Sequence, residues 1–257
     1  MAGAPWPAEM PRDRVTHRQQ TVRAVVTVGT GDDSVKRFVV LAGNIGAGKS
    51  TLVRLLSAML GWKPYYEPVA ENPFLSDFYQ DMSRWAFHSQ VFFLTHRIRS
   101  HAILTGEPQS VVQDRSLYED AEVFARNLFL QGRMTEREWA TYQELYRTVS
   151  ALLPAPDLVV YLRASVPTLR RRIDLRGRVF EAGITDSYLS QLNDLYEQWI
   201  DRLSLCPVLI VPGDTMDFVA ESRYLQSIAA AVVERLRGAQ GILFPEADQA
   251  DRGGGVG

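Results

Sequence analysis

The chain has 257 residues, of which 46% are hydrophobic, so it can bury a large core in one domain or at most two. Its 28 basic and 30 acidic residues give a net charge of −2, which does not favour nucleic acid or an anionic membrane as a partner. One cysteine, Cys206, excludes an intrachain disulfide and fits a cytoplasmic location. No apolar run reaches the roughly 18 residues of a membrane-spanning helix.

The two ends of the chain differ in composition from its centre. Residues 1–36 are rich in Pro, Gly, Arg and Asp, and we expect them to form a flexible extension in which residues 24–28 could be a short strand. Residues 239–257 end in a glycine-rich run and are expected to be a disordered tail. The sequence therefore predicts one folded domain over residues 37–238.

Within this domain, short apolar runs alternate with helical patterns. The runs are continuous and rich in β-branched residues, as is typical of strands buried on both faces of a parallel sheet. They cover residues 38–42, 111–113, 158–162 and 208–211, with a weaker candidate at 62–66. Helices are expected at residues 48–60, 83–105, 118–131, 135–152, 166–176, 186–203 and 217–236. The alternation predicts an α/β fold with a five-stranded parallel sheet flanked by helices.

A glycine-rich motif follows the first predicted strand and opens the first predicted helix. Residues 43–50 match the pattern G-x-x-x-x-G-K-[ST], in which backbone N–H groups and a helix N-terminus face phosphate oxygens. Lys49 is expected to reach the β- and γ-phosphates, and the Ser50 hydroxyl to ligate Mg²⁺. The expected phosphate-binding residues are Gly43, Asn44, Ile45, Gly46, Ala47, Gly48, Lys49, Ser50 and Thr51. The motif predicts a nucleoside triphosphate, and the absence of an Asn-Lys-x-Asp tetrapeptide argues against a small GTPase.

Two carboxylates follow later predicted strands. Glu67 comes after residues 62–66 and Asp114 after residues 111–113, so both are expected at the edge where ligands bind in an open α/β sheet. A kinase that acts on a hydroxyl group needs one carboxylate for its proton and another near Mg²⁺, and it benefits from an arginine such as Arg115. Taken singly, each of these residues could equally belong to a loop or a surface ion pair.

The order of the motifs is more specific than any one of them. The glycine-rich motif is followed by Glu67-Pro68, Arg84-Trp85-Ala86-Phe87 with Gln90, Asp114-Arg115-Ser116-x-Tyr118-x-Asp120 and Leu175-Arg176-Gly177-Arg178. Over roughly residues 37–237 the chain thereby resembles the deoxynucleoside kinase family, most closely the bacterial deoxyadenosine/deoxyguanosine kinases. The resemblance implies a P-loop kinase fold and ATP-dependent phosphorylation of the 5′-hydroxyl of a deoxyribonucleoside, preferably a purine, in nucleotide salvage. It also implies a homodimer built on helices near 83–105 and 118–152.

The resemblance assigns roles in catalysis and in sugar binding. Glu67 would be the general base for the 5′-hydroxyl, Arg115 would lie beside it, and Asp114 would act on the Mg²⁺ side. Tyr79 and Glu181 would hold the sugar 3′-hydroxyl.

Other residues would recognise the base. Gln90 would pair with the base edge, because one amide offers both a donor and an acceptor. Arg97 lies two helical turns away on the same face, at about 10.5 Å. Arg97 and Asp120 would read the exocyclic and N7 edge, unless they form only a structural ion pair. Phe124, four residues after Asp120, would stack on the base, and Trp85 is a further candidate for the nucleoside site or for the core.

Several arginines are concentrated between residues 170 and 180. Arg172 and Arg176 can share one helical face, and Gly177 would let the chain leave the helix before Arg178. By resemblance this segment is an Arg-rich lid whose three arginines, Arg172, Arg176 and Arg178, bind the ATP phosphates. The alternative is a solvated basic face, which is what we expect for Arg170 and Arg171.

Three other functions stay open at this point. A pyrimidine-preferring or broad deoxynucleoside kinase shares much of the framework. A nucleoside monophosphate kinase similar to thymidylate kinase shares the glycine-rich motif, the Asp-Arg pair and the Arg-rich lid. A non-enzymatic ATP-binding regulatory module would use the nucleotide only as a switch.

Overall fold

The computed structural model describes residues 35–66, 72–178 and 181–238. The predicted tail, the possible strand at residues 24–28 and most of the predicted N-terminal extension lie outside the described residues. The strands are β1 (Phe38–Ala42), β2 (Lys63–Tyr65), β3 (Val111–Asp114), β4 (Leu158–Arg163) and β5 (Val208–Pro212). The helices are α1 (Lys49–Leu60), α2 (Leu75–Gln80), α3 (Met82–Thr105), α4 (Leu117–Glu119), η2 (Asp120–Ala125), α5 (Arg126–Leu130), α6 (Glu136–Ser150), α7 (Val166–Arg176), α8 (Asp186–Arg202) and α9 (Ser222–Leu236).

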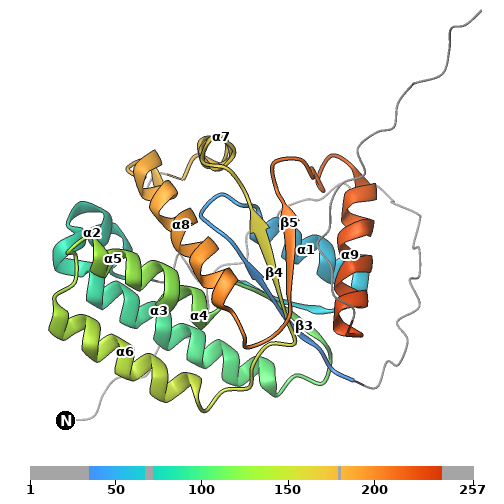
Figure 1. Ribbon diagram of the computed structural model, residues 1–257, viewed down its shortest axis with the longest axis horizontal. Helices are drawn as coiled ribbons and strands as arrows, with labels where there is room; N and C mark the ends of the chain where they lie inside the picture. Colours follow the sequence, from blue (N-terminus) through green and yellow to red (C-terminus); the bar gives the residue numbers. More distant parts are fainter. Residues whose placement is uncertain (1–34, 67–71, 179–180, 239–257) are drawn as a thin grey trace, which may run out of the picture.

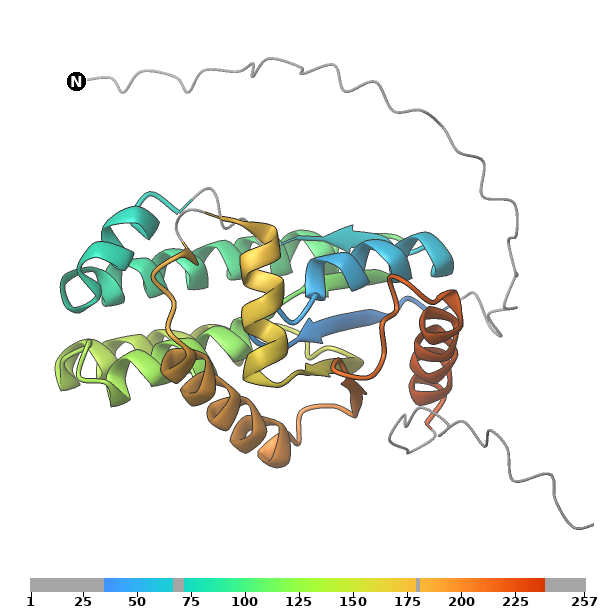
Figure 2. The same ribbon diagram turned by 90° about the horizontal axis from the view of Figure 1, so that it is seen from above.

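The strands form one parallel sheet in the order β2-β3-β1-β4-β5, which confirms the predicted five-stranded parallel sheet (Figure 1). Strand β1 lies in the middle, with Leu41 opposite Asp114 of β3 and Ala42 opposite Tyr161 of β4. The carboxyl end of β1 therefore lies between the carboxyl ends of β3 and β4. Figure 2 shows the helices arranged around this sheet.

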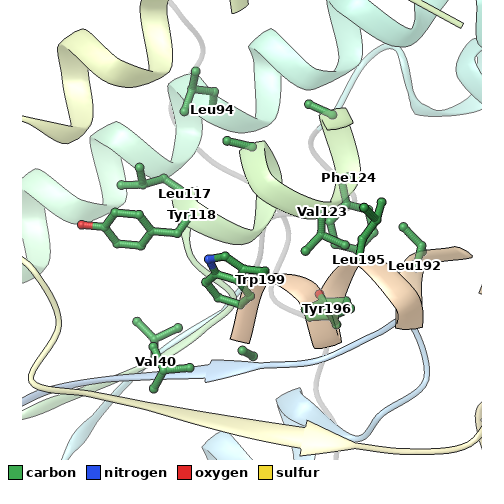
Figure 3. Packing of buried hydrophobic residues seen from close by; sticks show 14 of the residues in the cluster. Val40, Leu94, Leu117, Tyr118, Val123, Phe124, Leu192, Leu195, Tyr196 and Trp199 are labelled. Atoms are coloured by element: carbon green, nitrogen blue, oxygen red, sulfur yellow. The ribbon is translucent and has the colours of Figure 1, made fainter. Parts of the chain in front are cut away.

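Both faces of the sheet are buried, which explains the continuous apolar runs. Val40 and Ala42 pack on the face covered by α3, η2 and α8, whereas Val39 and Leu41 pack on the face covered by α1 and α9. Figure 3 shows the first of these cores, in which side chains of α8 lie between β1 and η2. Consecutive strand residues point to opposite faces, so a strand covered on both sides needs an apolar residue at every position.

The helices differ from the predicted ones at three places. The helix expected over residues 118–131 consists of α4, the π-helix η2 and α5. The helix expected from residue 217 begins at Ser222, because the Asp217 carboxylate accepts the N–H groups of Val219 at 3.1 Å and Ala220 at 2.9 Å in a turn. The short helix α2 was not expected at all. Among the described residues, no helix is long and apolar enough to cross a membrane.

Truncation of a central core side chain tests this arrangement. Leu41 is fully buried, so Leu41→Ala should lower the free energy of unfolding by about 2–5 kcal/mol through lost burial and a residual cavity. Leu152 is 79% exposed, so Leu152→Ala should change the free energy of unfolding by less than about 0.5 kcal/mol. Urea denaturation of both variants measures the difference, and equal values would contradict the described core.

Candidate active site

The glycine-rich loop between β1 and α1 is closely packed by its surroundings. Gly43 has φ 147°, and a Cβ atom there would lie 2.8 Å from the carbonyl oxygen of Leu162. Gly46 has φ 82°, and its Cβ would lie 2.8 Å from the carbonyl oxygen of Leu169 in α7. Only glycine fits these positions without a shift of backbone. The loop conformation thus depends on both β4 and α7.

The side chains of Asn44 and Lys49 in this loop form hydrogen bonds within the protein. The Asn44 amide donates to the carbonyl oxygen of Leu189 at 2.9 Å and to the Asn193 side chain at 2.8 Å, both in α8. Lys49 is buried, and its Nζ atom donates to the carbonyl oxygens of Gly43 at 2.8 Å and Asn44 at 3.0 Å. Of the two, the Asn44 side chain therefore anchors the loop to α8.

Ser50 and Asp114 meet at the ends of β1 and β3. The Ser50 hydroxyl donates to Asp114 Oδ2 at 2.5 Å. The other carboxylate oxygen, Oδ1, is buried and accepts no hydrogen bond from the described residues. A hydroxyl oxygen next to an unpaired carboxylate oxygen is the kind of donor set that Mg²⁺ prefers, so these two residues fit the expected metal.

Arg115 directly follows β3 in an unusual backbone conformation. Its φ is 65°, the one positive value outside glycine among the described residues. Its N–H donates to the carbonyl oxygen of Leu41 at 3.0 Å, and its guanidinium lies 4.1 Å from the ring centroid of Phe124. Left-handed backbone in a residue with a side chain is strained and is common at functional sites. The arrangement turns Arg115 away from the strand and over an aromatic ring.

A cavity of about 470 Å³ extends from the glycine-rich loop to α3. It brings together most of the predicted site residues: Ile45, Gly46, Gly48, Lys49, Ser50, Thr51, Tyr79, Gln90, Asp114, Arg115, Phe124, Arg176, Arg178 and Glu181. The Gln90 amide oxygen is buried and accepts no hydrogen bond from the described residues. An unpaired buried acceptor is costly, so this oxygen is suited to a ligand with a donor group.

Three predicted nucleoside residues do not line this cavity. Arg97 and Asp120 are buried and form an ion pair at 3.1 Å, and Arg97 also donates to the carbonyl oxygen of Asp114 at 3.0 Å. Trp85 stacks on Phe74 with ring centroids 5.6 Å apart. Asp120 and Phe124, which are four residues apart, both lie in the π-helix η2 and not in an α-helix, and only Phe124 lines the cavity.

The three predicted lid arginines all bond within the protein, two of them to the same carboxylate. Arg176 bonds to Glu181 at 2.5 Å and Arg178 to the same carboxylate at 3.4 Å, so residues predicted for the phosphates and for the sugar form one ionic group. Arg172 instead donates to the carbonyl oxygens of Ala47 at 3.0 Å and Gly213 at 2.7 Å.

Two further arginines of helix α7, Arg170 and Arg171, differ in exposure. Arg171 is exposed as expected, whereas Arg170 is half-buried and pairs with Asp186 at 2.7 Å, contrary to the expectation of solvation. Helix α7 ends at Arg176, with Gly177 at φ 64°, as the glycine predicted.

A second hollow of about 470 Å³ opens on the other side of the loop, between α7 and the segment after β5. It shares Gly46, Gly48, Thr51 and Arg176 with the first cavity. The remaining lining residues are Arg171, Arg172, Leu175, Met216, Asp217, Phe218 and Val219. Two hollows therefore border the glycine-rich loop, one on each side.

Some site residues were not predicted from the sequence. Phe93 also lines the first cavity and lies three residues after Gln90, so helical spacing could have revealed it. Tyr188 of α8 and Phe78 of α2 line the cavity as well, and no sequence signal points to them. Glu67, the predicted general base, lies outside the described residues, whereas the preceding Tyr66 lines the cavity.

Glu119 is the most buried carboxyl group near the loop and was also not predicted. Burial raises its pKa to about 7, against the opposing effect of the positive charges of Arg115 and Lys49. The Ser116-x-x-Glu119 capping box is readable in the sequence, because it pairs an N-cap hydroxyl with an acid three residues later. The sequence does not reveal that the Glu119 carboxyl group contacts the glycine-rich loop.

This raised pKa predicts a dependence of stability on pH. The folded state holds the Glu119 proton more tightly than the unfolded state, so stability from this group is present below pH 4.5 and is lost as the pH rises through about 7. Glu119→Gln and Glu119→Ala lack this titration. The Tm of the wild type should therefore fall relative to both variants between about pH 4.5 and 7, and change little relative to them at higher pH. Curves that stay parallel in differential scanning fluorimetry would contradict the raised pKa.

Comparison with known proteins agrees with this geometry. The deoxynucleoside kinase family model matches residues 39–237. The chain is 34% identical to a deoxyadenosine/deoxycytidine kinase of Bacillus subtilis over 193 residues, covering 74% of this chain and 89% of that protein. It is 36% identical to a deoxyguanosine kinase of Bacillus subtilis over 207 residues, covering 77% and 96%.

A solved structure of deoxyadenosine kinase from M. mycoides with bound dATP superposes with a TM-score of 0.67 at 28% identity, covering 78% of this chain and 100% of that one. A two-nucleotide complex of the same enzyme, with dCMP and dCDP, also superposes with a TM-score of 0.67. With the sheet, the glycine-rich loop and the matched residues taken together, the chain belongs to the deoxynucleoside kinase family.

Proposed function

We propose that this protein transfers the γ-phosphoryl group of ATP to the 5′-hydroxyl of a deoxyribonucleoside, preferably deoxyadenosine or deoxyguanosine, in nucleotide salvage. The reaction yields the 5′-monophosphate, ADP and a proton. The observation that carries the proposal is the cavity that joins Lys49 and Ser50 at one end to the unpaired Gln90 amide oxygen at the other. A nucleoside bound there would direct its sugar towards the phosphate loop and its base towards α3.

For the donor, we assign the phosphates to the loop and the adenosine part to the second hollow. The loop supplies N–H groups, the α1 N-terminus and Lys49. In the proposed lid at residues 170–180, Arg176 and Arg178 would exchange part of their bonding to Glu181 for phosphate oxygens. Arg172 holds backbone of the loop, so its proposed contact with phosphate would add to an anchoring role.

For the metal, Ser50 and Asp114 would hold Mg²⁺, as supported by their 2.5 Å contact and the unpaired Asp114 Oδ1. When bound, Mg²⁺ neutralises charge on the phosphate oxygens. The residues of the chain orient the two substrates around it.

For the acceptor, Glu67 would take the proton of the 5′-hydroxyl, and Arg115 would stabilise charge on the phosphoryl group. Tyr79 and Glu181 would bind the 3′-hydroxyl. Because Glu181 also bonds to the two proposed lid arginines, sugar binding and phosphate binding would compete for one set of partners.

For the base, Gln90 and Phe124 would make the direct contacts, and Trp85 would support this region from the side. A purine, with its larger ring system, would extend towards the buried Arg97–Asp120 pair. The related proteins are named for deoxyadenosine, deoxyguanosine and deoxycytidine, and we favour the purines among them. We further propose a cytoplasmic homodimer that buries exposed apolar side chains of the long helices, such as Ile103 of α3 and Leu145 of α6.

A substrate panel tests the proposed function. ADP release is measured with ATP or GTP as donor, and with deoxyadenosine, deoxyguanosine, deoxycytidine, thymidine, the ribonucleosides, deoxyAMP and dTMP as acceptors. Purine deoxynucleosides should give the highest kcat/KM, and EDTA should abolish turnover. Activity on monophosphates alone would favour a nucleoside monophosphate kinase. Salt-sensitive DNA binding without any turnover would favour a regulatory module.

The proposed general base has its own test. Glu67→Gln should lower kcat by about 10²-fold or more while ATP binding persists, because the amide cannot accept the 5′-hydroxyl proton. The exposed Glu144 of α6 gives a matched control, since Glu144→Gln removes one carboxylate of the same kind away from the cavity. Near-normal turnover of Glu67→Gln would remove Glu67 from this role.

A further inference from the structure

Glu119 joins three parts of the fold through one carboxyl group. It is fully buried at the end of α4. Its Oε1 atom accepts the N–H of Gly43, the first residue of the phosphate loop, at 3.2 Å. Its Oε2 atom accepts the N–H of Ser116, directly after Arg115, at 3.0 Å. The Tyr196 hydroxyl of α8 lies 2.8 Å from Oε1.

The two anchored N–H groups belong to a glycine with positive φ and to the residue that follows the strained Arg115 backbone. Gly43 has φ 147° and Arg115 has φ 65°. The backbone pairing of β1 with β3 ends where the Arg115 N–H donates to the carbonyl oxygen of Leu41. Beyond that point the phosphate loop and the residues after Arg115 diverge, so without a common partner each could relax separately. One buried carboxyl group bonded to both keeps their separation constant. Glu119 lines neither of the two hollows beside the loop, so its contacts are with the protein itself.

A count of protons shows how these bonds can coexist. The Tyr196 hydroxyl lies 2.8 Å from the carbonyl oxygen of Gly43 as well as from Glu119 Oε1, but it has one proton to donate. If Glu119 is protonated, it donates to the Tyr196 oxygen and Tyr196 donates to Gly43, so every close contact contains a proton. If Glu119 is ionised, one of the two contacts has none, and the carboxylate instead faces the charges of Lys49 and Arg115.

We propose that Glu119 is a positioning residue for phosphoryl transfer, which holds the phosphate loop and the Arg115 turn in fixed register through Gly43 and Ser116. This inference rests on the proposed kinase function, because it assigns Arg115 to the transferred phosphoryl group. Displacement of reacting groups by about 1 Å is enough to lower a rate by about 10²-fold. Loss of the link should therefore lower kcat more than it changes substrate binding.

Steady-state kinetics of three variants tests the role. Glu119→Gln keeps part of the hydrogen bonding and Glu119→Ala removes it, while Glu122→Gln changes a half-buried acid on the adjoining segment as a matched control. With active sites counted by binding of a fluorescent ATP analogue, kcat per site should fall about 10-fold in Glu119→Gln and about 100-fold in Glu119→Ala, with both KM values within about threefold of wild type. An unchanged kcat per site in both Glu119 variants would overturn the proposal.

Hydrogen–deuterium exchange supplies a readout that is independent of activity. In folded Glu119→Ala, peptides that cover residues 43–48 and 114–118 should both exchange faster, whereas Glu122→Gln should match the wild type. Faster exchange in neither segment, or in only one, would contradict the link. A wild type that phosphorylates no nucleoside would overturn the proposed function, and the exchange result would then still decide whether Glu119 joins the two segments.

Discussion

The central position of β1 is the constraint on which the rest of the site depends. Because β1 pairs with both β3 and β4, the phosphate loop that follows it emerges between two other strand ends. The register that sets Leu41 opposite Asp114 also lets the Arg115 N–H reach the carbonyl oxygen of Leu41. The loop, the proposed metal residues and the arginine are thus brought together by backbone pairing, before any side-chain contact is made.

Much of this could be predicted from the sequence because the signals are local or periodic. Strand β1 appears as an unbroken apolar run because both of its faces are buried, and the glycine-rich motif directly after it has fixed spacing. Gln90 could also be predicted as a site residue, because it is a polar side chain in an otherwise apolar part of its helix. The strand order, by contrast, depends on long-range pairing that no local pattern records.

The unpredicted features arise where tertiary contacts decide the local structure. The π-helix η2 is formed by residues with an ordinary helical pattern, so its presence reflects packing against α3 and α8. The bonds of Arg176 to Glu181, five residues later, and of Glu119 to Gly43 likewise join residues whose spacing in the sequence has no helical or strand period. Each of them places a carboxyl group beside a group that the sequence suggests for phosphate binding, an arginine or a backbone N–H of the glycine-rich motif. Internal pairing of this kind is consistent with a net charge of only −2 in a chain with 25 arginines.

The left-handed backbone of Arg115 has a consequence for which residues the position can accept. Glycine would suit the backbone best, yet it has no charge and could not cover the ring of Phe124. Asparagine tolerates the conformation, but it is too short to extend over that ring. Conformational preference and chemistry therefore favour different amino acids at this position. The arginine found there indicates that the contacts of a long cationic side chain contribute more at this turn than the strain of the left-handed backbone costs.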